Sequence, residues 1–261
     1  MDEMCLKDWF KKPEPFTYGN KLLIDFAIND YKGADNDLRG CLNDQKKKVA
    51  TFSGYWPDFK FRTFTDSECT RARLRDEVRA AFAAMPEGWL FIAYSGHGTY
   101  KKSSTEENGY SEAMYLYDGT FTDGEWVELM KEKPEKLKVV FMLDCCFSEG
   151  AVSLRGNPTY NRPRFLQSEE MPATFNVVKK ITEETLSYIC FAGSLEGEPS
   201  ADAYINGEFT GAHTFYFMRC IKPGESFITW QKRLDLYLPN KDFKQTPVLL
   251  GNKELMEEIL I

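Results

Sequence analysis

The chain alternates between uninterrupted apolar runs and segments in which apolar residues recur every three or four positions. Four apolar runs predict buried strands, at residues 21–28, 88–96, 138–144 and 185–194. Alternation over 59–66 predicts an edge strand, and "TPVLLG" predicts a last strand. Helical spacing marks residues 36–53, a segment capped by Thr70, a segment around Trp126, and residues 210–222 and 225–238.

This order of elements predicts an α/β fold, with a mostly parallel central sheet and helices on both faces. Residues 101–112 are expected to form a polar loop, and residues 151–180 an irregular connection that contains prolines. In sheets of this kind ligands bind beyond the carboxyl ends of the strands. Polar residues that directly follow a buried strand are therefore the first candidates for a site.

The composition of the chain limits the classes of partner that it is expected to bind. The chain has 261 residues and a net charge of −7, which disfavours nucleic acid and anionic membranes as partners. No apolar run reaches the length that spans a membrane, and the charged N-terminus lacks the apolar core of a secretory signal. The seven cysteines are odd in number and have no CxxC spacing, so we expect reduced thiols, a cytoplasmic location and no zinc site.

Two strand ends carry candidate chemistry. "YSGHGT" places His97 after one buried strand, and "DCCFSEG" places Cys145 and Cys146 after another. A histidine near a cysteine lowers the pKa of the thiol or accepts its proton, and the backbone amides of Gly98 and Cys146 are placed to bind an oxyanion. Taken singly, a buried histidine or cysteine is more often structural, and Cys145 remains an alternative nucleophile.

These motifs resemble those of the metacaspases and orthocaspases, caspase-like cysteine peptidases, as do "LRGCLND", "GEFTGAHTFYF" and "QTPVLLG". The resemblance implies a caspase-like αβα sandwich. Its expected parts are an N-terminal arm (1–20), a p20-like part (21–150), a linker (151–180) and a p10-like part (181–261). It makes Cys146 the nucleophile and His97 its partner in a dyad that cleaves after Arg or Lys. The S1 pocket carried over by motif consists of Cys41, Asp44, Ser95 and Asp144.

The chain departs from the family pattern at two places. Phe147 and Glu149 interrupt the segment after the nucleophile. Ser111 and Thr122 stand where the family's calcium-binding aspartates are expected, and calcium needs several carboxylate ligands. We therefore expect no cofactor and weak or absent dependence on calcium.

The predicted function is a cysteine endopeptidase, acting on protein or peptide substrates with Arg or Lys at P1. A monomer is favoured. Residues 151–172 contain Arg155 and Arg164, two candidate sites of self-cleavage, although an ordinary surface loop is the alternative. A different class of function also stays open, in which a catalytically weak caspase-like domain acts by binding. The lysines at 46–48 are expected on a solvated helix face.

Overall fold

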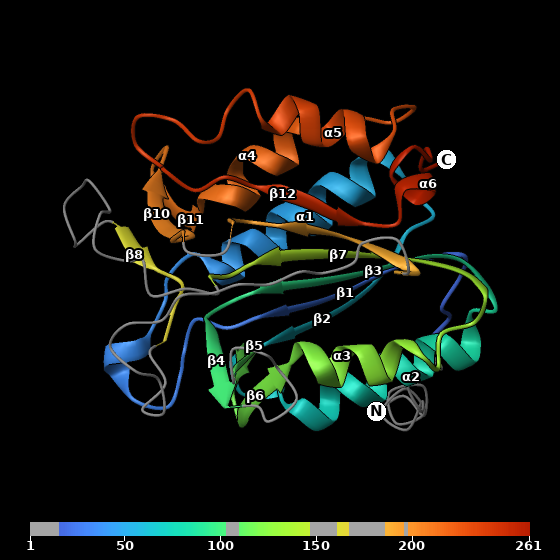
Figure 1. The fold of residues 1–261 in the computed structure, drawn as a ribbon, viewed down its shortest axis with the longest axis horizontal. Coiled ribbons are helices and arrows are strands. Elements are labelled where there is room, and N and C mark those ends of the chain that lie inside the picture. Colours follow the sequence, from blue (N-terminus) through green and yellow to red (C-terminus); the bar gives the residue numbers. More distant parts are fainter. Residues whose placement is uncertain (1–15, 103–109, 147–160, 167–185, 196–197) are drawn as a thin grey trace, which may run out of the picture.

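A six-stranded sheet forms the centre of the molecule (Figure 1). The computed structural model describes residues 16–102, 110–146, 161–166, 186–195 and 198–261. Neighbouring strands in this sheet are parallel except for β12, which runs antiparallel to β9. The strands in spatial order are β12 (Val248–Gly251), β9 (Tyr188–Ala192), β7 (Lys136–Asp144), β3 (Glu87–Ser95), β1 (Lys21–Ala27) and β2 (Lys60–Thr65).

Helices cover both faces of this sheet, so the protein has three layers (Figure 1). One face carries α2 (Arg71–Ala84) and α3 (Asp123–Met130), and the other carries α1 (Cys41–Tyr55), α4 (Ala212–Cys220) and α5 (Phe227–Leu234). Successive strand residues point to opposite faces, so Leu22 and Ile24 join the core beneath α2 and α3, and Leu23 joins the other core. The α/β sandwich with helices on both faces is confirmed.

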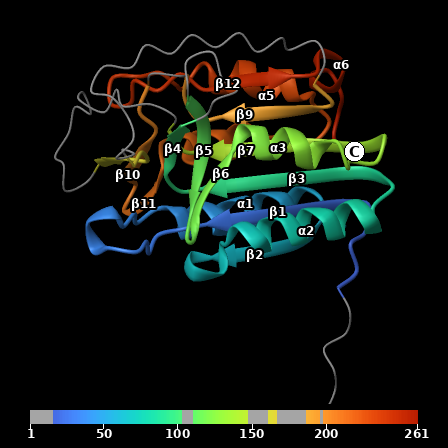
Figure 2. The same ribbon diagram turned by 60° about the horizontal axis from the view of Figure 1, so that its bottom comes forward.

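Two three-stranded sheets stand at the carboxyl ends of the central strands (Figures 1 and 2). The first consists of β4 (Gly98–Lys102), β5 (Tyr110–Leu116) and β6 (Gly119–Thr122). The second consists of β8 (Asn161–Pro163), β10 (Ala201–Ile205) and β11 (Glu208–Gly211). Short 3-10 turns at Ala34–Asn36 and Asp66–Glu68 and helix α6 (Lys253–Met256) complete the described elements.

Three local predictions are wrong. Helix α1 begins at Cys41 rather than near residue 36, because Asp202 and Asn29 accept the backbone amides of residues 39–41. The ends of the predicted 101–112 loop belong to strands β4 and β5. Lys48 is not solvated, since it lies buried with its Nζ atom 2.7 Å from a carboxylate oxygen of Asp25.

Nothing tests the predicted division into arm, p20-like part, linker and p10-like part. Residues 1–15, and most of the predicted linker, lie outside the described residues. Among the helices of the described ranges, none is both long and apolar enough to cross a membrane.

Candidate active site

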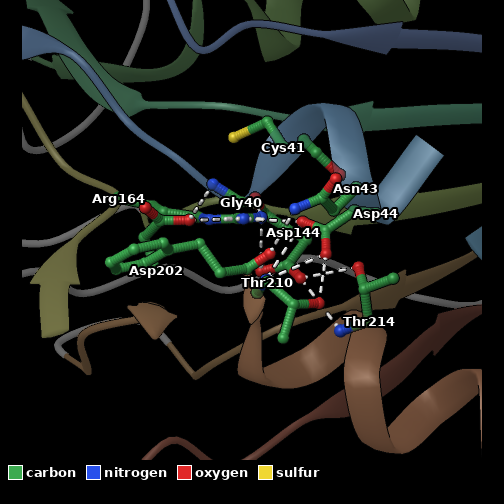
Figure 3. A network of polar contacts seen from close by, with 12 residues as sticks. Gly40, Cys41, Asn43, Asp44, Asp144, Arg164, Asp202, Thr210 and Thr214 are labelled. Atoms are coloured by element: carbon green, nitrogen blue, oxygen red, sulfur yellow. Dashed lines mark hydrogen bonds and ion pairs between the residues drawn. The ribbon is translucent and has the colours of Figure 1, made fainter. Parts of the chain in front are cut away.

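The side chain of Arg164 fills a pocket made of three carboxylates (Figure 3). Its Nη2 atom lies 2.6 Å from Asp44 and 3.0 Å from Asp202, and its Nη1 atom lies 3.3 Å from Asp144. Asp44 comes from the first turn of α1, Asp144 from the last residue of β7, and Asp202 from β10. Arg164 is fully buried, so the guanidinium exchanges its hydration for these acids.

Threonines and a glycine hold the acids in place. Thr210 and the amide of Gly211 donate to Asp44, and the amide and hydroxyl of Thr214 donate to Asp144. A side chain at Gly211 is excluded, because its Cβ atom would lie 2.1 Å from a carboxylate oxygen of Asp144. The start of α4 therefore forms one wall of the pocket (Figure 3).

Among the described residues the charge of the pocket is unbalanced, with three acids around one guanidinium. Burial raises the pKa of Asp44 to about 6, against the attraction of Arg164. Burial acts on Asp144 as well, but the Arg164 charge and the Thr214 hydrogen bonds outweigh it and lower the pKa of Asp144 to about 2. Of these two carboxylates, Asp44 therefore takes up a proton first.

The backbone of Arg164 meets the two predicted oxyanion donors. Its carbonyl oxygen accepts hydrogen bonds from the amides of Gly98, at 2.9 Å, and Cys146, at 3.1 Å. The two strand ends approach so closely that a Cβ atom on Gly98 would lie 1.7 Å from the Cys146 carbonyl oxygen. Glycine at position 98 is thus a condition for both amides to reach one oxygen.

His97 is held in one tautomer. Its Nε2 atom lies 2.7 Å from the carbonyl oxygen of Asn36, which only accepts hydrogen bonds, so Nε2 carries the proton. Its Nδ1 atom is buried and has no hydrogen-bond partner among the residues that the structure describes, so it keeps a lone pair. Burial lowers the pKa of His97 to about 4, so the ring is neutral at pH 7. The Tyr31 hydroxyl accepts the His97 amide, and the Tyr94 hydroxyl donates to the His97 carbonyl oxygen.

Cys146 is a neutral thiol in this arrangement. Burial raises its pKa to about 12, although the amide of Ser200 donates to the sulfur. The thiol in turn donates to the Ser200 carbonyl oxygen at 3.2 Å. Cys145 lies in the hydrophobic core beneath α2 and α3, where it packs among apolar side chains.

Residues 161–164 run along the edge of β10 as an added antiparallel strand. Asn161, Arg162 and Pro163 pair with Ala203, Asp202 and Ala201. The Arg164 amide donates to the Ser200 carbonyl oxygen at 2.9 Å. Because hydrogen-bonded and non-bonded pairs alternate in antiparallel ladders, Pro163 falls at a pair that needs no amide donor. A proline therefore fits next to Arg164.

Two of the four predicted S1 residues contact Arg164 directly. Asp44 and Asp144 bind Arg164, and Cys41 is buried near the pocket, where the Arg164 charge acts on its pKa against the larger effect of burial. The hydroxyl of Ser95 accepts a hydrogen bond from Lys48 instead. Sequence reasoning missed Asp202 as a pocket acid, and it placed Arg164 only as a candidate for cleavage. Arg155 lies outside the described residues, as do Phe147 and Glu149.

The segment where family resemblance places calcium carries basic side chains as well as acids. Thr122 caps α3, and the carboxylate of Glu125 binds both Arg71 and Arg75. The adjacent hollow, of about 450 Å³, is lined by four basic side chains together with three glutamates. Within the described ranges no three His, Cys, Asp or Glu side chains form a group that would hold a metal ion.

Comparisons of this chain with known proteins point to one family. The model of the caspase domain matches residues 22–254. Metacaspase-1 of Candida glabrata is 25% identical, over 88% of this chain and 72% of its own length, and Metacaspase-1 of Schizosaccharomyces pombe is 26% identical, over 88% and 67%. The crystal structure of protein GSU0716 from Geobacter sulfurreducens shares the fold, with a TM-score of 0.68 at 20% identity over 92% of this chain and 97% of that one. The chain belongs to the caspase-domain family of cysteine peptidases and groups there with the metacaspases.

Proposed function

We propose that this protein is a cysteine endopeptidase that cleaves after Arg or Lys, and that one of its substrates is its own Arg164–Phe165 bond. One observation carries the proposal. The Arg164 side chain lies in the acidic pocket while its carbonyl oxygen accepts from the amides of Gly98 and Cys146. A P1 residue must meet both conditions at once for acyl transfer.

The proposed reaction starts from the neutral Cys146 thiol and the neutral His97 imidazole. The Cys146 sulfur attacks the Arg164 carbonyl carbon as His97 Nδ1 takes the thiol proton. The amides of Gly98 and Cys146 bind the oxyanion that forms. Collapse breaks the bond to the Phe165 nitrogen, which leaves as an amine with the proton from His97. Water then hydrolyses the Cys146 thioester to a carboxylate and regenerates the thiol.

The pocket supports a cationic P1 residue. Three carboxylates around one side chain favour guanidinium or ammonium and would repel an aspartate. Asp44 and Asp144 were carried over by motif, and Asp202 adds a third charge. Cleavage after Asp would require the opposite charge.

The competing function, a catalytically silent binding module, has its own support. The Cys146 thiol is fully buried and its pKa is about 12, so the nucleophile is protonated and shielded. If the bond after Arg164 is not cleaved, residues 161–166 block the site permanently.

Incubation of the purified chain separates the two functions. Wild type is expected to yield fragments 1–164 and 165–261, detected by intact mass and by a new N-terminal Phe165. Cys146→Ala and Arg164→Ala are expected to stay whole, and Arg155→Ala serves as the matched arginine control. A wild-type chain that remains intact, together with no hydrolysis in a coumarin panel with Arg, Lys or Asp at P1, would support the binding module.

Calcium is not part of the proposed mechanism. The carboxylate of Glu125 is already neutralised by two arginines, and basic side chains line the hollow beside it. Self-cleavage is therefore expected to proceed equally in EGTA and in calcium. Activity that disappears in EGTA and returns with calcium would refute this.

A further inference from the structure

The chain that follows Arg164 lies along strand β4. The Gly98 amide donates to the Arg164 carbonyl oxygen at 2.9 Å, and the Leu166 amide donates to the Gly98 carbonyl oxygen at 3.0 Å. Phe165 and Gly98 thereby form a parallel bridge. Backbone pairing thus continues on the far side of the proposed scissile bond.

Two side chains of β4 add contacts to this pairing. The Thr99 hydroxyl donates to the Leu166 carbonyl oxygen at 2.7 Å and is almost fully buried. The ring of Tyr100 meets the ring of Phe165 edge-on, with centroids 6.3 Å apart. Backbone and side chain of the two residues after Arg164 are therefore both contacted.

The position of β4 explains why it is open to such pairing. In the sheet order β4-β5-β6, β5 pairs with one edge of β4, and the other edge receives residues 165 and 166. On the other side of Arg164, β8 adds to the edge of β10. One extended chain therefore joins two sheet edges, and added strands of this kind bind through backbone hydrogen bonds that any sequence offers.

We propose that β4 is the prime-side binding strand of this peptidase. It takes the two residues after the scissile bond in parallel alignment. Thr99 fixes the carbonyl group of the second residue, and Tyr100 favours an aromatic or large apolar first residue. This inference rests on the proposed function, because it defines a subsite for the same reaction.

Peptide binding to the full chain that carries Cys146→Ala and Arg164→Ala tests it without turnover. The probes are fluorescent Asn-Arg-Pro-Arg-Phe-Leu, its Gly analogue at the Phe position, and Asn-Arg-Pro-Arg-amide, which has no prime side. Fluorescence anisotropy is expected to show the hexapeptide binding about tenfold tighter than the tetrapeptide amide, and about fivefold tighter than the Gly analogue.

Thr99→Val is expected to reduce the advantage of the hexapeptide over the tetrapeptide about fivefold, since it removes one buried donor. Thr120→Val, on β6 of the same sheet, is the matched control and should keep the advantage. Equal affinity of the two peptides, or equal losses in Thr99→Val and Thr120→Val, would overturn the inference. If the tetrapeptide binds without any prime-side gain, only this inference fails. If no peptide binds to a variant that circular dichroism shows to be folded, the acidic S1 pocket of the proposed function fails with it.

Discussion

Removal of the Arg164 cation is expected to destabilise the folded chain strongly. Asp44, Asp144 and Asp202 are each at most 2% exposed, and in the described part of the chain Arg164 is the cation that contacts all three. Removing one partner of a buried ion pair costs about 3–5 kcal/mol, because the remaining charges stay desolvated. Arg164→Ala should therefore lower the free energy of unfolding by about 3–5 kcal/mol at pH 7.5, with water entry into the pocket favouring the lower end.

The assay is urea unfolding followed by circular dichroism, with Cys146→Ala in every protein so that no chain cleaves itself. Arg162→Ala is the matched control, because Arg162 is half-buried and its side chain donates a hydrogen bond to the Asp37 carbonyl oxygen at 3.0 Å. Loss of this hydrogen bond should lower the free energy of unfolding by about 1 kcal/mol.

The deficit of Arg164→Ala should also shrink as the pH falls from 7.5 to 5. Without the guanidinium, the pKa of Asp44 rises further above about 6, so the variant takes up a proton that neutralises part of the excess charge. Equal losses in the two arginine variants, or a deficit that does not change with pH, would refute the buried charge cluster.

Three further outcomes follow from the same site. Asp202→Asn should reduce kcat/KM on an Arg-coumarin substrate about 10- to 100-fold, since it removes one charged hydrogen-bond acceptor of the P1 side chain. An unchanged kcat/KM would show that Asp202 does not contribute to binding the P1 side chain. Gly98→Ala should slow self-cleavage at least about 100-fold in a mass-spectrometric time course, because its Cβ atom would meet the Cys146 carbonyl oxygen at 1.7 Å and separate the oxyanion donors; wild-type rates would contradict this. Self-cleavage should slow as the pH falls through about 6, where Asp44 loses its charge. The same protonation stabilises the folded state, because the pKa of Asp44 is raised on folding, and this gain appears as the pH falls from about 6 to about 4. A cleavage rate that does not change down to pH 5 would exclude Asp44 as the titrating group.

The strands and the position of the site were within reach of the sequence. Each apolar run is long enough for one buried strand and is followed by polar residues, as in 88–96 and 138–144. The carboxyl ends of parallel neighbours meet at one edge, so His97 and Cys146 could be expected near each other before the fold was known. The resemblance supplied Asp44 and Asp144, which spacing alone would have left as an ordinary helix charge and a capping carboxylate.

The sequence did not predict Asp202 as the third acid of the pocket, nor the short strands. Asp202 lies in "SADAY", which has no helical or strand period strong enough to place it, and it is 158 residues from Asp44 in the chain. Strands β4, β8 and β10 contain only three to five residues each, and their pairing depends on partners elsewhere in the sequence. Lys48 likewise reads as a solvated lysine until Asp25 is found beside it.

By itself the sequence determined the layers of the fold, because burial patterns with periods of 2 and 3.6 are local properties of a strand or a helix. It also determined which residues carry reactive groups. Only the tertiary structure decided which arginine occupies the acidic pocket, which amides share its carbonyl oxygen, and which strand receives the chain beyond it. Those contacts join segments that are tens to more than a hundred residues apart, and the closure of such distances is set by the packing of the whole chain.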